Sequence, residues 1–270
     1  MEKVEINEEN LGVSKDLTEE QKNIRNIALF GIDSTGDKGR SDAIMILTLD
    51  EKHNKVKLTS IMRDSYVDIK GQKDKINHAY AYGGPELAIK TINENFGLNI
   101  KDFISVNFDS LGAIIDELGG VSIKITEEEV THIPGISATG VHNLTGAQAL
   151  AYSRIRYASG GDYQRTQRQR NIMQGIYESF RYTELTEYPG LISSFLPYVT
   201  SNMGGTEMIG IGTEYAAIMS SGLDQIRFPR DGEGQNKMIN GVYYLEYDIE
   251  KAGKAMRSYI FDDERIPFEK

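Results

Sequence analysis

The alternation of apolar and polar residues predicts a series of short β-strands after the first 23 residues of the chain. Runs of mostly apolar and β-branched residues, separated by turn-forming residues, are typical of strands. The predicted strands cover residues 26–32, 43–49, 56–61, 103–108, 121–125, 225–229 and 242–245. A polar cluster at residues 50–54 separates the second run from the third, so we expect these two runs to form a hairpin.

Apolar residues at helical spacing predict helices between these strands. Pro85 opens one such pattern and Gly97 ends it, while Asp109 or Ser110 can cap the next. Further helices are predicted at residues 145–152, 162–182, 191–199, 206–220 and 249–260. Because strands and helices alternate without a large shift in composition, the pattern indicates one α/β domain with a mixed sheet.

The amino-acid composition excludes cysteine-based sites and argues against a nucleic-acid-binding protein. Residues 1–23 carry seven acidic residues against three lysines and little apolar periodicity, so we expect a linker or a loosely attached leader there. The chain has no cysteine, which excludes disulfides, thiolate zinc sites and cysteine nucleophiles. Its 30 basic and 40 acidic residues give a net charge of −10, which argues against a nucleic-acid partner bound through bulk charge.

The basic residues are distributed unevenly. Residues 151–181 carry six arginines against only Asp162 and Glu178, and no lysine lies between Ile125 and Asn236. Arginine is the side chain best suited to bidentate recognition of phosphate or carboxylate. An arginine cluster on an acidic protein therefore indicates a focused anion site.

Two carboxylates flank the loop between the first two predicted strands. Residues 31–42 nearly match a phosphate-binding P-loop, but Asp37 intervenes before Lys38 and no serine or threonine follows the lysine. If the two strands are neighbours, Asp33 and Asp42 lie at one edge of the sheet. Two carboxylates with open positions suit Mg²⁺, which keeps waters and takes phosphate oxygens. The alternative is ordinary turn chemistry, because Asp, Ser and Gly are common in loops.

The predicted helix 162–182 continues its core-facing stripe into charged residues. Arg165 and Gln169 extend the apolar stripe toward the helix N-terminus, with Arg168 alongside. Buried arginines need partners, and a helix N-terminus favours anions, so a phosphate pocket explains the pattern. A structural network with acidic residues is the alternative. Arg154 and Arg156 would project together if the chain between them were extended.

The charged motifs occur in an order that resembles the LytR-CpsA-Psr family of Gram-positive bacteria. The resemblance spans about residues 24–182. It is carried by residues 31–33, 39–43, 60–64, 75–80 and 144–156, and by Asp162 with 165–169. It implies an α/β/α sandwich with a central mixed β-sheet. It also implies an N-terminal membrane anchor missing from this sequence, with residues 1–23 as the linker after it and residues 24–270 as the catalytic domain. The expected location is the extracellular face of the cytoplasmic membrane of a Gram-positive bacterium.

The resemblance further implies a Mg²⁺-dependent phosphotransferase. Such an enzyme moves a glycopolymer, teichoic acid or capsule, from an undecaprenyl-pyrophosphate carrier onto the muramic-acid C6 hydroxyl of peptidoglycan. The prenyl chain requires a long apolar groove, which periodicity cannot distinguish from core. Two other functions stay open: a non-catalytic module that binds polyprenyl pyrophosphate or anionic polymers, and a lipid pyrophosphatase.

The residue roles follow from the matching motifs. Asp33 and Asp42 are expected to hold Mg²⁺, and Asp42 to accept the proton of the attacking hydroxyl. The catalytic set is Asp42, Arg63 and Arg156. The phosphate-binding set is Arg63, Lys75, Arg154, Arg156, Arg165, Arg168 and Gln169, with Asp162 orienting arginines and capping the helix. The chain departs from the family pattern at Ser34-Thr35, where an arginine is common, and at Met62, where proline is common.

Overall fold

The structure, a computed structural model, describes residues 1–33, 39–155 and 161–265. The helices are α1 (Glu19–Lys22), α2 (His78–Phe96), α3 (Phe108–Glu117), α4 (Glu127–Val130), α5 (Gly146–Ser153), α6 (Gly161–Arg181), α7 (Tyr188–Phe195), α8 (Gly205–Glu214) and α9 (Ile249–Phe261). The strands are β1 (Glu2–Lys3), β2 (Arg25–Asp33), β3 (Arg40–Asp50), β4 (Lys55–Ile61), β5 (Tyr66–Ile69), β6 (Gln72–Lys75), β7 (Asp102–Asn107), β8 (Val121–Ile125), β9 (Gly140–Leu144), β10 (Thr200–Ser201), β11 (Leu223–Phe228), β12 (Gln235–Ile239) and β13 (Val242–Glu246).

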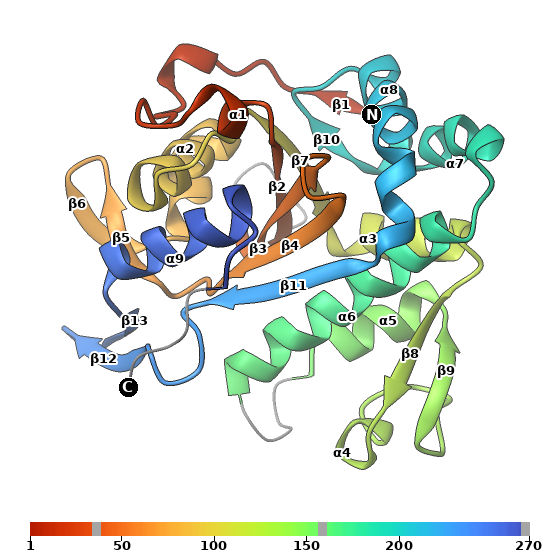
Figure 1. Cartoon of the computed structure of the whole chain (residues 1–270). Helices are drawn as coiled ribbons and strands as arrows, with labels where there is room; N and C mark the ends of the chain where they lie inside the picture. The colour runs from red at the N-terminus through yellow and green to blue at the C-terminus, as the bar shows by residue number, and fades with distance from the viewer. Residues whose placement is uncertain (34–38, 156–160, 266–270) are drawn as a thin grey trace.

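A mixed sheet of seven strands forms the centre of the molecule (Figure 1). Its strand order is β1-β10-β7-β2-β3-β4-β11. Strand β3 is antiparallel to both β2 and β4, whereas β7 runs parallel to β2 and β11 parallel to β4. The predicted hairpin and the predicted mixed sheet are both confirmed.

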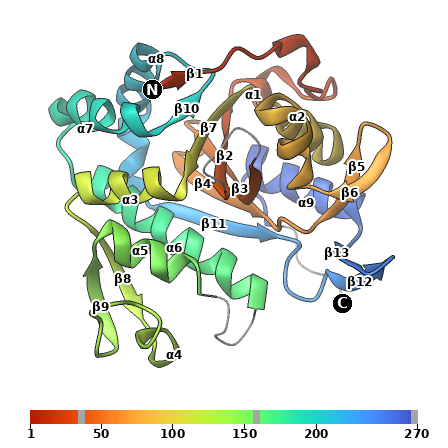
Figure 2. The same cartoon turned by 180° about the vertical axis from the view of Figure 1, so that it is seen from behind.

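Helices cover both faces of this sheet, which gives the predicted α/β/α sandwich (Figures 1 and 2). Successive side chains of a strand point to opposite faces. Phe30 and Ile46 therefore pack with α2 and α9 on one face, and Ile27 and Leu49 pack with α6, α7 and α8 on the other. A smaller third cluster packs the β8–β9 hairpin against α3, α5 and α6.

The first 23 residues pack against the domain. Leu11 is fully buried and Leu17 nearly so, and the amide of Ser14 donates to the carbonyl of Leu98 at 2.9 Å. Strand β1 adds to the edge of the sheet beside β10. The expectation of a loosely attached leader is therefore wrong. Two leucines among acidic residues bury enough apolar surface to anchor the segment, although they form no period.

Two predicted helix caps are wrong. The side chain of Asn107 accepts a hydrogen bond from the amide of Ser110 at 2.8 Å, so α3 is capped by Asn107 and not by Asp109 or Ser110. Helix α6 begins at Gly161, which makes Asp162 a residue of its first turn. A carboxylate in that position can face neighbouring side chains instead of the helix amides.

Other boundaries shift for local reasons. Helix α2 begins at His78 and is interrupted by non-helical backbone at Gly83 and Gly84, so the predicted start at Pro85 is the start of its second half. The predicted helix 206–220 divides into α8 and a 3₁₀ segment, Tyr215–Ser221. In the part of the chain that the structure describes, no helix is both long enough and apolar enough to cross a bilayer.

Candidate active site

A β-bulge at the end of the β2–β3 hairpin positions Asp42, one of the two predicted metal ligands. The pairing register shifts after Gly31, so that Asp42 is an extra residue between Ser41 and Ala43. A Cβ at Gly31 would lie 2.9 Å from that of Ala43, so the strands approach this closely only with glycine there. Bulges re-aim side chains next to active sites. Asp42 and the exposed Asp33 both line a polar cavity of about 160 Å³.

Arg63 joins three carboxylates beside this cavity. Its Nη1 donates to Asp42 at 2.7 Å, and its Nε lies 3.4 Å from carboxylate oxygens of Asp64 and Asp162. Burial lowers the pKa of Arg63, but the three carboxylates outweigh that effect and hold its pKa above the ordinary value. Arg63 is therefore a permanent cation that fixes the position of Asp42.

The N-terminal half of α6 brings Arg165 and Gln169 into the same cavity, one helical turn apart. Arg165 is only 6% exposed, and its Nη2 lies 2.7 Å from Asp162. Asp162 therefore orients both Arg63 and Arg165, as predicted, although it does not cap the helix. The position near the start of a 21-residue helix also favours an anion.

Arg154 completes the described cationic lining of the cavity. Its guanidinium lies over the ring of Phe108, 4.4 Å from the centroid, and this contact holds the side chain in place. The backbone at Arg154 is helical, and the joint projection of Arg154 and Arg156 stays a prediction. Arg156 and Ser34-Thr35 lie outside the described residues.

Arg168 and Lys75 do not join this cavity. Among the described residues, its lining includes Arg154 and Arg165 but neither Arg168, Lys75 nor Arg63. Arg168 is buried on another side of α6, where its Nε donates to Glu129 at 2.7 Å. Its Nη1 also donates to a main-chain carbonyl. Arg168 therefore forms an ion pair with an acidic residue, which is the alternative given in the sequence analysis. Lys75 pairs with Asp64 at 2.7 Å, behind Arg63.

The donor set around the polar cavity fits Mg²⁺. No group of three or more His, Asp or Glu side chains is placed to hold a metal within residues 1–33, 39–155 and 161–265. Mg²⁺ is often held by one or two carboxylates together with water and substrate phosphate. Asp33 and Asp42 supply two carboxylates, and the arginines opposite them suit the phosphate. Arg63 and the amide of Asn77, 3.4 Å away, fix Asp42 in place.

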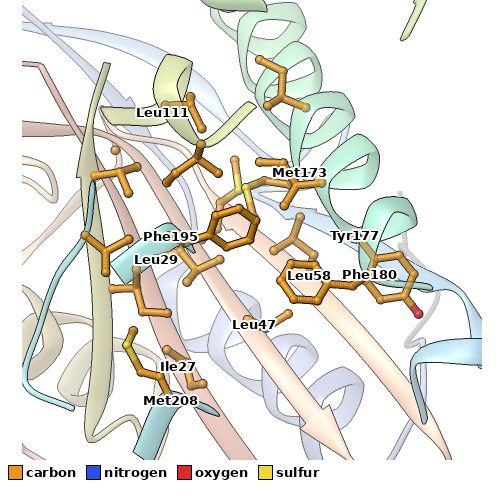
Figure 3. A pocket seen from close by; sticks show the side chains of 18 of the residues that line it. Ile27, Leu29, Leu47, Leu58, Leu111, Met173, Tyr177, Phe180, Phe195 and Met208 are labelled. Carbon is orange, nitrogen blue, oxygen red and sulfur yellow. The ribbon is translucent and has the colours of Figure 1, made fainter. Parts of the chain in front are cut away.

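A large apolar cavity adjoins the polar one. It has a volume of about 340 Å³ and lies between the sheet and helices α3, α6, α7 and α8 (Figure 3). The lining shared by the two cavities consists of Phe108, Ser153 and Gln169. From Arg165 to Phe180, α6 runs about 22 Å along both cavities at 1.5 Å per residue. The walls come from β2, β3 and β4 on one side and from the apolar stripe of α6 on the other.

Sequence reasoning missed two residues that line the cavities and one that holds a lining residue in place. Phe108 and Ser153 contribute to both cavities, and Asn77 holds Asp42. Ser153 and Asn77 belong to motifs that the family resemblance already used. Phe108 gave no such signal, because an aromatic residue between a strand and a helix is indistinguishable from core.

Comparison with known proteins supports one family over almost the whole chain. Residues 2–259 match the sequence model of the LytR_cpsA_psr family. The polyisoprenyl-teichoic acid–peptidoglycan teichoic acid transferase TagU of Bacillus anthracis is 37% identical over 233 residues, which are 84% of this chain and 75% of TagU. TagU of Bacillus licheniformis is 32% identical over 228 residues, 82% of this chain and 72% of that protein.

The fold is also that of solved structures. TagT bound to LI-WTA superposes with a TM-score of 0.75 at 26% identity, covering 92% of this chain and 96% of TagT. TagV of B. subtilis superposes with a TM-score of 0.71, also at 26% identity, covering 88% of this chain and 98% of TagV.

Proposed function

The chain belongs to the LytR_cpsA_psr family, and we propose that it is a Mg²⁺-dependent phosphotransferase that attaches a glycopolymer to peptidoglycan. The donor is an undecaprenyl-pyrophosphate-linked glycopolymer, and the acceptor is the muramic-acid C6 hydroxyl. The TagU relatives are teichoic acid–peptidoglycan transferases, which supports this class of reaction. We place the enzyme at the extracellular face of the cytoplasmic membrane, held there by an N-terminal anchor.

The observation that carries the proposal is the pair of adjoining cavities. One is polar and lined by arginines and carboxylates, and the other is apolar and more than twice as large. Together they match a molecule with an anionic head and a long apolar tail, which is the chemistry of a polyprenyl pyrophosphate. TagT, which shares the fold, has been solved bound to LI-WTA.

The apolar cavity is suited to a lipid tail. Its walls are almost entirely apolar, so a prenyl chain that enters it leaves water for apolar contacts. Each CH₂ group buried in this way contributes about 0.8 kcal/mol.

The described residues can perform most of the reaction by position and charge. Arg154 and Arg165 bind the phosphates, and Phe108 and Asp162 hold these arginines in place. Mg²⁺, held by Asp33 and Asp42, supplies further neutralisation of phosphate charge when bound. The sugar hydroxyl attacks the phosphorus joined to the glycopolymer, the P–O bond to undecaprenyl phosphate breaks, and Asp42 accepts the hydroxyl proton.

The test is a reconstituted reaction. Purified protein is incubated with Mg²⁺, a synthetic lipid-pyrophosphate sugar and peptidoglycan fragments, and the products are identified by mass spectrometry. A sugar–phosphate–muropeptide product is expected. Free sugar phosphate alone would favour the pyrophosphatase. Tight donor binding without any product would favour the non-catalytic binding module.

A further inference from the structure

Two small hairpins meet near the candidate active site, and their tyrosines form an aromatic surface. Residue 65, just before β5, bridges to Leu245 of β13, and the β5–β6 and β12–β13 hairpins lie together at one end of the molecule (Figures 1 and 2). The rings of Tyr66 and Tyr244 lie 4.8 Å apart. This surface belongs to neither cavity.

Lys75 connects this surface to the candidate active site. Its Nζ lies 5.7 Å from the ring centroids of both Tyr243 and Tyr244. The same Nζ pairs with Asp64 at 2.7 Å, and Asp64 lies 3.4 Å from the guanidinium of Arg63. A chain of three ion pairs, Lys75–Asp64, Asp64–Arg63 and Arg63–Asp42, therefore joins the aromatic surface to Asp42.

Tyr82 of α2 extends the surface outward and is 63% exposed. Its hydroxyl donates to Asp74 at 2.7 Å, and the ring of His78 lies 2.9 Å from the same carboxylate. The hydroxyl of Tyr244 reaches Asp74 at 3.5 Å. Burial raises the pKa of Asp74, but the hydrogen bonds from Tyr82 and His78 outweigh it and hold that pKa below the ordinary value. Asp74 is thus an ionised acceptor among aromatic rings at neutral pH.

We call the surface formed by Tyr66, Tyr82, Tyr243 and Tyr244, with Asp74 and Lys75, the tyrosine wall. The exposed ring of Tyr82 offers a flat apolar face, and the carboxylate of Asp74 accepts from its hydroxyl edge. The ammonium group of Lys75 lies over the half-buried rings of Tyr243 and Tyr244. Pyranose rings have apolar C–H faces and equatorial hydroxyls, and free carboxylates occur on peptidoglycan fragments. The wall is complementary to both. A net charge of −10 disfavours a nucleic acid as the partner that would stack on these rings.

We propose that the tyrosine wall binds the saccharide of the acceptor, a peptidoglycan glycan strand, and so presents its hydroxyl to the phosphate site. This inference rests on the proposed transfer reaction. The donor saccharide is held through its own phosphate, whereas the acceptor has no such link and needs a separate surface that brings its hydroxyl to the phosphates. Burying the ring of Tyr82 under a sugar supplies affinity, since aromatic side chains contribute large contact areas at low entropic cost.

The first experiment measures binding without any donor. Isothermal titration calorimetry uses a soluble, lipid-free peptidoglycan tetrasaccharide with wild type, Tyr82→Ala and Tyr243→Ala. The expected result is a Kd raised at least tenfold in both variants. Tyr182→Ala is the matched control, because Tyr182 is 79% exposed and directly follows the C-terminal end of α6. Its Kd should stay within twofold of wild type. Because the ring of Tyr82 is largely exposed, Tyr82→Ala should melt within about 2 °C of wild type.

The second experiment separates this inference from the proposed reaction. In transfer assays, Tyr82→Ala should raise the KM for the acceptor at least fivefold while the KM for the lipid donor keeps its wild-type value. A Kd unchanged by both wall substitutions would overturn the tyrosine wall even if transfer occurs. Tighter binding of a single-stranded oligonucleotide than of the tetrasaccharide would also overturn it. Wall-dependent glycan binding with no transfer from any lipid donor would instead contradict the proposed function.

Discussion

At the scale of single residues, the two carboxylates of the polar cavity differ in what surrounds them. Asp33 is exposed at the end of β2, whereas Asp42 is buried in the bulge and paired with Arg63. From sequence, replacement of either is expected to leave the fold intact. The structure predicts this for Asp33 only, because removal of Asp42 leaves the cation of Arg63 partly unpaired.

We therefore expect Asp33→Ala and Asp42→Ala each to abolish Mg²⁺-dependent turnover. Asp33→Ala should melt like wild type, while Asp42→Ala should lose about 1–3 kcal/mol of the free energy of unfolding. Mg²⁺ titrations of turnover, together with thermal melts, measure both effects. Turnover that still depends on Mg²⁺ in the double variant would contradict the assignment of the metal ligands.

Arg165 and Arg168 of α6 have different surroundings, which the sequence did not predict. Arg165 faces the polar cavity, whereas Arg168 is buried against Glu129. Arg168→Ala should cost about 3–5 kcal/mol of unfolding free energy, because the carboxylate of Glu129 would lose its buried partner. Arg165→Ala should cost less stability and remove most of the stabilisation given by a short-chain prenyl pyrophosphate. Denaturant unfolding with and without this ligand compares them; an equal ligand effect in wild type and Arg165→Ala would exclude Arg165 from the phosphate site.

Arg170 points away from the cavity, as its position on the helix predicts, but it is 8% exposed, and its Nη1 lacks a hydrogen-bond partner among the described residues. Burial lowers the pKa of Arg170 to about 10, and the nearby Arg227 adds to this. Arg170→Ala should reduce activity far less than Arg165→Ala. Arg170→Met should raise the free energy of unfolding by about 1–2 kcal/mol at pH 7, because it removes a buried cation that forms no ion pair with a carboxylate of the described residues. Equal activity losses for both alanine variants would show that the functional face of α6 is misassigned.

At the scale of elements, the contact of α3 with α5 controls the position of Ser153 and Arg154. A Cβ added at Gly146, the first residue of α5, would lie 2.1 Å from the carbonyl oxygen of Gly112 in α3. Gly146→Ala must therefore separate the two helices and should cost about 1–3 kcal/mol of stability, with reduced turnover. Gly210→Ala is the control. It lies in α8 with no atom within 4 Å of the added Cβ and should gain about 0.5–1 kcal/mol. Chemical denaturation of both variants decides between these outcomes.

Helix α6 links the two cavities as one element. Its first turns carry Arg165 and Gln169, and its later turns carry the apolar residues opposite the sheet. Sequence periodicity predicted this stripe correctly. It could not tell that the apolar half lines a cavity, because the same spacing describes a helix packed against a filled core.

At the scale of the whole molecule, we expect the apolar cavity to affect both the melting temperature of the protein and its affinity for long prenyl chains. Met173→Trp, on the cavity side of α6, should fill part of the void. We expect a higher melting temperature without ligand and binding of a prenyl pyrophosphate of eleven isoprene units weakened at least tenfold. Inorganic pyrophosphate should bind as in wild type, because the polar cavity is unchanged. Val141→Trp, at a β9 position that is 71% exposed, is the control and should leave lipid binding unchanged. Equal lipid affinities in the two variants would show that the tail does not occupy this cavity.

Much of the site could be predicted from motifs, and the errors have definite physical causes. Asp33, Asp42, Arg154, Arg165 and Gln169 do line one cavity, as expected. The error on residues 1–23 arose because a few well-placed leucines suffice for docking. Lys75 and Arg168, which were expected to bind phosphate, are instead paired with Asp64 and Glu129 outside the polar cavity. The sequence did not predict these pairs, because they depend on how separate elements pack together.

The sequence by itself determined the α/β class, the central hairpin, most helix positions and the family, because these follow from local periodicity, turn chemistry and motifs in a fixed order. It also predicted that arginines and two carboxylates form an anion site. Only the tertiary structure decided which of these arginines line the polar cavity, because the direction of a buried charge depends on partners from other elements. It alone revealed the bulge that turns Asp42 into the cavity, the void along α6 and the meeting of four tyrosines. These features arise from register shifts and from incomplete packing between layers, neither of which leaves a periodic trace along the chain.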